Sequence, residues 1–562
     1  MQACVSHYFT LTAIAEARFL MKTLTVGILI DGEDQPGWIR DVIAWVRARS
    51  DIDCTVLIAR EKSSGARTAP SHPRTSIFYR GLARLESKML AARERVLIDE
   101  AAPVPDLLTL SHYDVDTSSD AHGVMTVSDV SLAGLSRAAP IDLVIALGMP
   151  VLRGTMVRFA PMGLWQLSYA DVTQVCDRHA GFWQVMSRAD HTSVKLWRMG
   201  GACETDALIE SRTFNTEVFW LKNHVRSLSL GNLMLFDALK RLTQTPAKLQ
   251  LPVTLQGEAI DLRDRPNNWQ SAAYLVRQTA LMTNLMWMRM VRKNVTWRIG
   301  MCADEQVQAV AASAEVLTAP KGSFYADPFV YTHGGTPYIF FEDYAFNEGK
   351  GKISAATYID GKFVFLGVVL DLPYHLSFPY IFEHDGTIFM MPETCGNRTI
   401  ELWKCVDFPL KWELASTLMN DVSAVDSIIF PREGRWWLLT NIDRANGYSH
   451  SDELFAFYAD SPTSTSWTAH QANPVVRSPS RARNAGIVVS PTGELTRCAQ
   501  YQGFCHYGKG VSLNRIVTLT PEEYVETEGP IHYARLIKRS RPSMHHCHHN
   551  NGMTVFDFAY LE

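Results

Sequence analysis

The chain has 562 residues, of which 47% are hydrophobic and 20% charged, and its formal net charge is −4. This length exceeds what one hydrophobic core usually holds, so we expect two or three domains. The charge gives no indication of a nucleic-acid partner, and we expect none. Ten scattered cysteines without a C-x-x-C pair, and no secretory signal, predict free thiols in the cytoplasm. Residues 1–21 are expected to be a leader, either disordered or a mis-assigned start.

Residues 22–220 alternate between strand and helix patterns. Continuous apolar runs at 24–31, 53–60 and 141–148 predict buried strands, and residues 37–50 carry apolar side chains at helical spacing. Strands that are apolar along their whole length, and that are separated by helices, predict a parallel sheet covered on both faces. This segment is therefore expected to be an α/β domain.

Residues 221–294 have the pattern of long helices and are expected to form a helical linker. The most apolar stretch is "TALMTNLMWM" at 279–288, between Arg277 and Arg289. It is shorter than the roughly 20 apolar residues that a membrane span needs, so we predict no transmembrane segment. A buried helix is the favoured interpretation of this stretch, and an interfacial helix is the alternative.

Residues 295–562 change to short strands separated by turns. Their hairpins repeat an apolar strand, a glycine-containing turn and an aromatic strand, at intervals of roughly 50 residues. These turns are HGGT at 333–336, HDGT at 384–387, REGR at 432–435 and PTGE at 491–494. The repeat predicts a β-propeller, with a β-sandwich as the alternative. Pairing of residues 295–301 with the last strand would close the ring, give five blades and remove the open edge.

Motifs that follow one another along residues 295–562 carry a family resemblance. They are "YADPFV", "YIFFED", "HLSFPYIFEHDGTIFMMPE", "AVDSIIF", "RARNAG" and "GVSLNRIVTL". They resemble the propeller domain at the N-terminal end of plant glucosamine inositolphosphorylceramide transferases, which also occurs in bacterial polysaccharide-cluster proteins. That domain is similar to the five-bladed fold of arabinanases, levansucrases and invertases. The resemblance implies a carbohydrate, glycolipid or nucleotide-sugar ligand, and we expect no cofactor.

In the bacterial relatives the propeller follows a formyltransferase-like domain. Residues 22–220 resemble a diverged copy of that domain in "VGILID" and "DLVIALGMPVLRG". Active formyltransferases carry an Asn-x-His pair followed by an Asp. The residues at and after this place are Gln166, Ser168, Tyr169, a displaced His179, and Glu204 or Asp206. Without an imidazole general base, formyl transfer is not expected, so we interpret the domain as degenerate.

Three acidic residues at predicted strand ends are the candidate catalytic groups: Asp327, Glu393 and Asp426. Glycosidic chemistry needs two carboxyl groups, one as proton donor and one as base or nucleophile. Because each acid borders a buried run, we expect equivalent blade positions that face one desolvated funnel, where burial separates the carboxyl pKa values. Glu393 is predicted to be the acid, Asp327 the base or nucleophile, and Asp426 to orient the sugar. The alternative is that all three cap turns.

Other polar residues near these strands are predicted to bind the substrate, with surface turn positions as the alternative. Arg483 and Asn484 are predicted to recognise an anionic group such as phosphate, since a guanidinium group suits it. The full predicted set is Glu342, Asp343, His375, Ser377, Arg483, Asn484, Tyr501 and His506, with Gln502 and Tyr507 lining the same mouth.

The stretch "HHCHHNN" at 545–551 suggests a metal site. Side chains alternate between the faces of a strand, so at most His545, Cys547 and His549 could converge. A structural or incidental role is the favoured interpretation, and we assign no metal.

Together these patterns predict a two-module protein of surface-polysaccharide or glycolipid biosynthesis. The propeller is expected to make or break a glycosidic bond, as a glycosyltransferase or a glycoside hydrolase-like enzyme. The alternative is a non-catalytic glycan-binding module that partners a glycosyltransferase, because the plant relatives place their transferase chemistry in a separate domain. A weaker alternative is a sugar N-formyltransferase.

Overall fold

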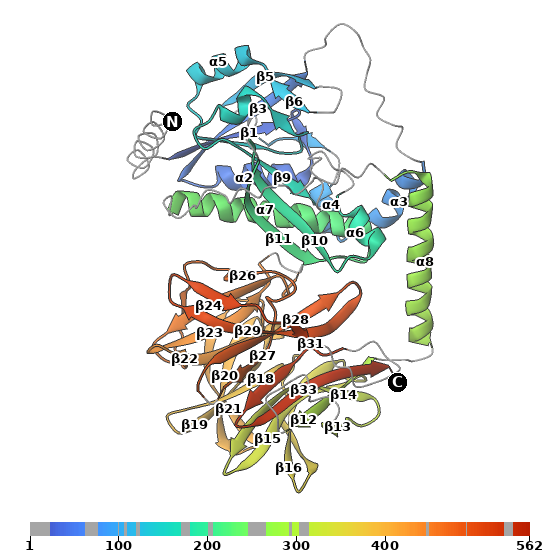
Figure 1. The fold of residues 1–562 in the computed structure, drawn as a ribbon, viewed down its shortest axis with the longest axis vertical. Helices are drawn as coiled ribbons and strands as arrows, with labels where there is room; N and C mark the ends of the chain where they lie inside the picture. The colour runs from blue at the N-terminus through green and yellow to red at the C-terminus, as the bar shows by residue number, and fades with distance from the viewer. Residues whose placement is uncertain are drawn as a thin grey trace. The chain divides into compact units, whose positions relative to one another are not determined.

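The computed structural model describes most of the chain, in thirteen segments. These are residues 23–61, 77–98, 101–105, 110–119, 124–169, 180–200, 206–244, 266–290, 295–302, 314–444, 449–490, 492–532 and 543–561. The chain forms two compact units (Figure 1). The first comprises Met1–Arg212 and Thr216–Ala280, and the second Thr213–Asn215 and Leu281–Glu562. The expected leader, 1–21, lies outside the described residues.

The first unit is built on a nine-stranded mixed sheet in the order β11-β10-β9-β7-β1-β3-β5-β6-β8. The strands are β1 Leu24–Ile30, β3 Ile52–Glu61, β5 His112–Ser119, β6 Met125–Val127, β7 Leu143–Ala146, β8 Leu152–Arg153, β9 Leu164–Tyr169, β10 His191–Arg198 and β11 Ala207–Asn215, and a separate pair joins β2 Asp34–Gln35 to β4 Ala102–Pro103. Strand β1 pairs in parallel with β3 and β7, and β7 with β9. The three predicted apolar strands therefore do form the parallel centre of an α/β sheet. Strand β5 was not predicted.

The helices of the first unit are α2 Gly37–Arg47, α3 Ile77–Ser87, α4 Ala92–Ile98, α5 Asp129–Ala138, the 3₁₀ turn η3 Thr155–Arg158, α6 Phe182–Ser187 and α7 Trp220–Gln244. They bury apolar side chains, except α4, in which the buried side chain is Glu94. Helix α7 contacts α2, α3, α4, α6, β9 and β10. Its buried side chains include Leu228, Leu235 and Leu239. It is thus a core helix of the first unit, at a place where we predicted a linker.

Helix α8, Asn268–Met290, is packed only in its N-terminal half. Ser271 and Tyr274 are buried, and the Tyr274 hydroxyl donates to Glu86 Oε1 at 2.6 Å and accepts from the Trp220 amide at 2.9 Å. Further along, the exposed large side chains are Leu285, Met286, Trp287 and Met290. The prediction that this stretch is buried is therefore wrong, because apolar composition alone does not supply a partner. Among the described residues, no helix is long and apolar enough to cross a membrane.

The second unit is almost entirely β. Three sheets contain β14–β17, β18–β21 and β22–β26, and a nine-stranded sheet contains β12, β13 and β27–β33. Their bounds are β12 Val295–Cys302, β13 Glu315–Leu317, β14 Ser323–His333, β15 Thr336–Ala345, β16 Lys350–Ile359, β17 Lys362–Leu370, β18 Ser377–His384, β19 Thr387–Glu393, β20 Thr399–Asp407, β21 Lys411–Asn420, β22 Ala424–Arg432, β23 Arg435–Ile442, β24 Glu453–Ala459, β25 Thr468–Ala469, β26 Val476–Arg477, β27 Asn484–Val489, β28 Leu495–Gly503, β29 His506–Leu519, β30 Tyr524–Thr527, β31 Ile531–His532, β32 Cys547–Asn550 and β33 Met553–Leu561, with a short turn η6 at Cys395–Asn397.

Two predicted features of this unit are confirmed. Strand β12 pairs antiparallel with the last strand, β33, along its whole length, from Val295↔Leu561 to Cys302↔Thr554. The first three predicted hairpins turn through two residues of positive φ each, as tight hairpins require. These are Gly334–Gly335, Asp385–Gly386 and Glu433–Gly434.

The first strands of three sheets, β14, β18 and β22, lie beside one another and beside β27 and β32, which are neighbours in the middle of the nine-stranded sheet; these five are called the first strands below. Strand β14 contacts β18 and β32, β22 contacts β18 and β27, and β27 contacts β32, so the five strands follow one another around a ring. Among the described residues, a hydrophobic cluster lies along this ring and includes Phe329, Tyr380, Ile428 and Ile487. The core therefore fixes the mutual positions of side chains that these strands carry at their beginnings.

Candidate acidic site

An irregularity near the start of the first strands sets the direction of two acidic side chains. The pairing register shifts between Ala326 and Phe329 in β14 and between Val425 and Ile428 in β22. A bulge of this kind re-aims the side chain that it carries. Asp327 and Asp426 occupy these bulges with φ of 49° and 50°, a conformation that most residues avoid. Both are buried, at 6% and 2% exposure.

The equivalent place in β18 carries an aromatic residue, Phe378, with φ of 47°. The acid of that sheet comes from the end of the second strand instead. Glu393 in β19 pairs in register with Ser377, as Glu342 in β15 pairs with Ala326. The expectation that Asp327, Glu393 and Asp426 occupy equivalent positions is therefore wrong, because acids from both first and second strands contribute to the site.

The carboxylates are close enough to change one another's protonation. Burial raises the pKa of Glu393 to about 8, and the charges of Asp426 and Asp327 add to this while Arg483 opposes it. Burial raises the pKa of Asp327 to about 7, against the attraction of His545. Burial is also the main cause of the raised pKa of Glu342, and the charges of Asp327 and Glu393 raise this pKa further. The structure thus brings the three predicted catalytic acids and Glu342 into one electrostatic environment.

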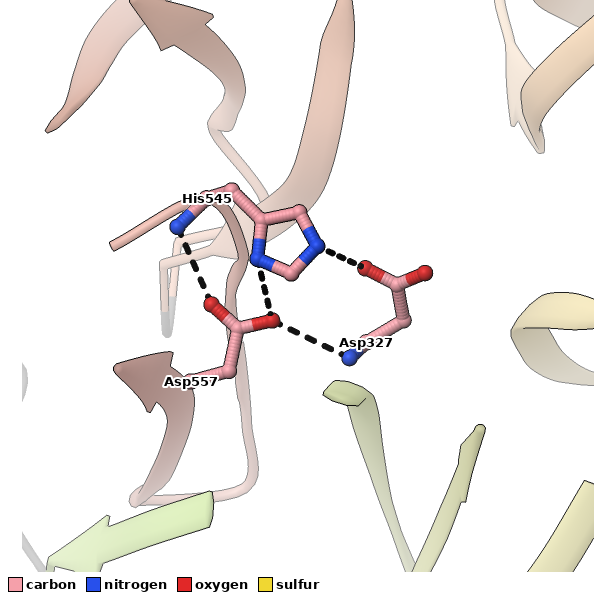
Figure 2. A group of neighbouring side chains, drawn as sticks. All are labelled: Asp327, His545 and Asp557. Carbon is pink, nitrogen blue, oxygen red and sulfur yellow. Dashed lines mark hydrogen bonds and ion pairs between the residues drawn. The ribbon is translucent and has the colours of Figure 1, made fainter. Parts of the chain in front are cut away.

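Asp327 faces an imidazole that a second carboxylate supports (Figure 2). His545 Nε2 lies 3.3 Å from Asp327 Oδ1, and His545 Nδ1 lies 2.7 Å from Asp557 Oδ2. Burial lowers the pKa of His545, but the two carboxylates outweigh this and raise it above its usual value. The charge of this imidazole, when it is protonated, favours the ionised form of Asp327.

Asp557 also fixes the backbone around Asp327. Its Oδ2 accepts the Asp327 N–H at 3.1 Å, and its Oδ1 accepts the N–H groups of His545 at 3.0 Å and His546 at 2.9 Å. Asp557 is fully buried. One carboxylate in the last strand therefore holds the bulge of β14 and the chain that enters β32.

Asp426 is held by the neighbouring sheet. Arg483 Nε donates to Asp426 Oδ2 at 2.6 Å, and the Arg483 guanidinium lies 5.5 Å from the centre of the Tyr507 ring. Asn484 is completely buried, and its Nδ2 donates to the backbone oxygens of Asp426 and Leu439. The predicted role of Asn484 in ligand binding is therefore corrected: its amide positions the strand that carries Asp426.

The remaining predicted binding residues lie at varied places. His375 Nε2 is 3.6 Å from Glu342 Oε1, and its Nδ1 accepts the Gly351 N–H at 2.8 Å, so His375 joins the acidic site. Asp343 is partly exposed and accepts a hydrogen bond from Ser354 at 2.9 Å. Ser377 is buried and pairs in register with Glu393. Lys509 Nζ lies 5.4 Å from the centre of the Tyr501 ring. His506 Nε2 lies 2.7 Å from Ser543 Oγ, and Gln502 Nε2 donates to Ser451 Oγ at 3.0 Å.

The polar residues of the first unit that we compared with formyltransferase positions are used structurally. Gln166 is buried, and its Nε2 donates to the Pro150 oxygen at 2.8 Å. Ser168 accepts from Trp197 Nε1 at 2.9 Å, and Asp206 forms an ion pair with Arg153 at 2.8 Å. His179 and Glu204 lie outside the described residues.

Two residues of the site, Asp557 and His545, were not predicted as site residues. Asp557 stands alone as a charge in the apolar strand "TVFDFAY", and an isolated acid in a buried strand is a usable signal. His545 was considered only for metal binding. Nothing local indicates that it faces Asp327, because 218 residues separate the two in the sequence.

Among the described residues, Asp327, His545 and Asp557 could together hold a metal ion, since their ligand atoms lie within 4.8 Å of one another. His545 also lies within ion-pair distance of both carboxylates without a metal. The trio considered from the sequence does not gather there: His549 Nδ1 contacts Thr554 Oγ1 at 2.8 Å, and Cys547 packs in an apolar cluster with Cys498.

The fold and the site define the second unit as a propeller-like β domain with a buried acidic centre. The family model described as "Glucosamine inositolphosphorylceramide transferase 1, N-terminal" matches residues 290–554, which confirms the predicted resemblance for this segment. The glucosamine inositolphosphorylceramide transferase 1 of Arabidopsis thaliana is 37% identical over 212 residues, covering 37% of this chain and 27% of that protein. Its counterpart in Oryza sativa subsp. japonica is 36% identical over 208 residues, covering 36% and 28%. The chain thus spans well under half the length of these relatives.

Solved structures of carbohydrate-active enzymes also align with this chain. Zg3597, a family 117 glycoside hydrolase of the marine bacterium Zobellia galactanivorans, aligns with a TM-score of 0.30 and 12% identity, covering 42% of this chain and 85% of that one. An exo-1,5-α-L-arabinanase from a bovine ruminal metagenomic library aligns with a TM-score of 0.29 and 16% identity, covering 44% and 95%.

Proposed function

We propose that the second unit is a five-bladed propeller whose acidic centre binds a carbohydrate and makes or breaks a glycosidic bond. The nine-stranded sheet counts as two blades, since a single parallel pair, Val488↔His549, joins its halves. The ring of first strands β14, β18, β22, β27 and β32 supports this count. The acids then surround the axis of the ring.

The carrying observation is a group of buried carboxyl groups with different neighbours, since the His545 imidazole lies beside Asp327 and the Arg483 guanidinium beside Asp426. Glu393, with a pKa raised to about 8, holds a proton at neutral pH and serves as the acid. Asp327, with a pKa of about 7 and an imidazole 3.3 Å away, ionises more readily and serves as base or nucleophile. Asp426, paired with Arg483, orients the sugar. This division of roles is what glycosidic chemistry requires.

The sugar is proposed to be an amino sugar. The relatives are named glucosamine inositolphosphorylceramide transferase 1, a name that contains an amino sugar. A buried centre with several carboxyl groups attracts the ammonium group of such a sugar and stabilises its charged form. The matched segment covers 27% of the Arabidopsis thaliana protein. A lipid acceptor and a glycosyltransferase partner are therefore also proposals for this chain.

One observation favours a second function, a glycan-binding module without turnover. Asp327 contacts the imidazole of His545, and Asp426 is paired with the guanidinium group of Arg483. Carboxylates held in this way can accept sugar hydroxyl groups without taking part in proton transfer.

The two functions are separated by isosteric variants. The assay uses purified full-length chain with 4-nitrophenyl glycosides of glucosamine and N-acetylglucosamine for turnover, and glucosamine titration calorimetry for binding. For an enzyme, Glu393→Gln and Asp327→Asn lower turnover at least about 100-fold while glucosamine still binds. Glu348→Gln, a surface acid paired with Lys352, is the control. Binding without any turnover in the wild type would leave the glycan-binding function, and neither binding nor turnover would contradict both.

The first unit is proposed to be a degenerate formyltransferase-like domain, and the cytoplasmic location stays a prediction. The structural use of Gln166, Ser168 and Asp206 supports the loss of activity. Folate-dependent formylation of an amino sugar by the purified protein would contradict this proposal.

A further inference from the structure

A serine, a cysteine and a histidine from three separate connections between strands meet in the second unit. Ser423 Oγ lies 2.9 Å from His450 Nε2. Cys395 Sγ lies 3.6 Å from Ser423 Oγ and 3.9 Å from His450 Nε2. The roles proposed above for the acidic centre use none of these three residues, which are called the Ser–Cys–His cluster below.

The sheets of the ring bring the cluster together. Cys395 begins η6, two residues after Glu393, and Ser423 directly precedes β22, the strand that carries Asp426. His450 lies three residues before β24. Because β22 and β24 both pair antiparallel with β23, their beginnings lie at the same end of one sheet. The cluster therefore lies at the end of the sheet from which Asp426 also comes.

Backbone hydrogen bonds hold the segment that carries the serine. The Val422 N–H donates to the Arg398 oxygen at 3.0 Å, and the Asp443 N–H donates to the Ser423 oxygen at 3.1 Å. These bonds tie the residues around Ser423 to the end of η6 on one side and to the end of β23 on the other. The position of the Ser423 hydroxyl is therefore fixed by the fold.

The hydroxyl and the imidazole have the spacing of a nucleophile and its base. The Oγ–Nε2 distance of 2.9 Å falls in the range of about 2.6 to 3.2 Å that such pairs show. Ser423, Cys395 and His450 are all partly exposed, so a substrate can reach them from solvent. This separates His450 from His546 and His548 of the same unit, which are buried.

The surroundings favour a neutral imidazole, which is the form that accepts a proton. Burial and then the charge of Arg483 lower the pKa of His450, against the carboxylates of Asp443 and Asp426. Burial raises the pKa of the Cys395 thiol, so the reactive thiolate is disfavoured. Ser423 is thus the better placed nucleophile. The positive charge of Arg483 also favours the negative oxygen that develops during attack on a carbonyl group.

We propose that Ser423 and His450 are the nucleophile and the general base of a second catalytic site, which cleaves a carboxylic ester. Ser423 Oγ bonds to the ester carbonyl carbon, and its proton passes to His450 Nε2. The bond between this carbon and the alcohol oxygen then breaks, and the departing alcohol takes that proton. A water molecule attacks the acyl-serine in the same way, which releases the carboxylic acid and restores Ser423. This proposal is independent of the carbohydrate function of the acidic centre.

Labelling of the purified full-length chain with a fluorescent fluorophosphonate tests the nucleophile, because this probe bonds covalently to activated serines. Mass spectrometry of the digested protein is expected to locate the label on Ser423, and Ser423→Ala is expected to lose it. Ser416→Ala is the matched control and keeps the label, since the partly exposed Ser416 donates to the Thr463 oxygen at 3.3 Å. A wild type without label, or a label only on another residue such as Cys395, overturns the proposal.

A second variant tests the base. His450→Gln leaves Ser423 in place but removes the proton acceptor, so both labelling and the hydrolysis of 4-nitrophenyl acetate are expected to slow at least about 100-fold. His384→Gln, at a histidine whose side chain is 29% exposed in another sheet, is expected to leave both rates unchanged. Thermal unfolding confirms that each variant is folded. A folded His450→Gln variant that reacts as fast as the wild type overturns the role of His450.

Discussion

Asp557 is the side chain on which the geometry of the acidic centre depends most. It accepts three backbone N–H groups and contacts the His545 imidazole, while completely buried. Replacing its carboxylate would leave the His545 imidazole with one carboxylate partner, Asp327. An amide in its place would also direct its NH₂ group at neighbouring donors.

Asp557→Asn is therefore expected to lower the unfolding free energy by about 3 kcal/mol, in the range for a broken buried ion pair. Urea denaturation followed by tryptophan fluorescence measures this. Asp385→Asn is the matched control, since its side chain is 87% exposed in a hairpin turn where Asn tolerates the positive φ. Equal, small losses in both variants would show that Asp557 does not hold the site together.

The raised carboxyl pKa values predict a pH dependence of stability. Asp327 and Glu393 titrate near pH 4 in an unfolded chain, but their pKa values in the folded protein are about 7 and about 8. Between these limits the folded state holds more protons than the unfolded state, so the unfolding free energy falls as the pH rises. The slope is about 1.4 kcal/mol per pH unit for each extra proton.

We therefore expect the wild type to lose unfolding free energy between about pH 5 and about pH 8, and Glu393→Gln to lose less, because the amide does not titrate. Urea midpoints at the two pH values measure the difference. A wild type and a variant with the same pH slope would contradict the raised pKa of Glu393.

At the scale of elements, the junction between β27 and β32 depends on close approach of two backbones. Gly486 in β27 has φ of 102°, and a Cβ atom there would lie 2.2 Å from the Cys547 carbonyl oxygen. Gly493 also has a positive φ, of 80°, but a Cβ atom there would meet nothing within 4 Å. The two glycines thus separate backbone strain from a steric clash.

Gly493→Ala is expected to cost about 1 kcal/mol of unfolding free energy through strain alone. Gly486→Ala adds the clash with backbone and is expected to cost at least about 2 kcal/mol more. Thermal unfolding of both variants gives the comparison. A loss in Gly486→Ala no greater than in Gly493→Ala would mean that the junction can widen without cost.

Much of each element could be predicted from local patterns. The apolar runs predicted β1, β3 and β7, and the glycine turns predicted the hairpins of the second unit. Burial of α8 was predicted wrongly, because the sequence shows that a helix has an apolar face but not whether a partner covers it. The predicted positions of the acids were only partly right, because the bulge of β18 carries Phe378 where β14 and β22 carry an acid, and the acid of that sheet is Glu393 on the second strand.

At the scale of the whole molecule, the acidic centre depends on closure of the ring of first strands. Asp327 comes from the first strand of one sheet, and its partners His545 and Asp557 come from the end of the chain. Pairing of β12 with β33 joins the first strand of the second unit to its last strand. Such long-range contacts leave no local signal, which is why the sequence indicated the carboxylates but not the imidazole between two of them.

The most direct test of the acidic centre as a sugar site is a crystal structure of the Glu393→Gln variant soaked with glucosamine. We predict a sugar ring in contact with Asp327 and Asp426, with the introduced amide facing a ring oxygen or hydroxyl group. Glucosamine bound at another place, with this centre unoccupied, would contradict the account.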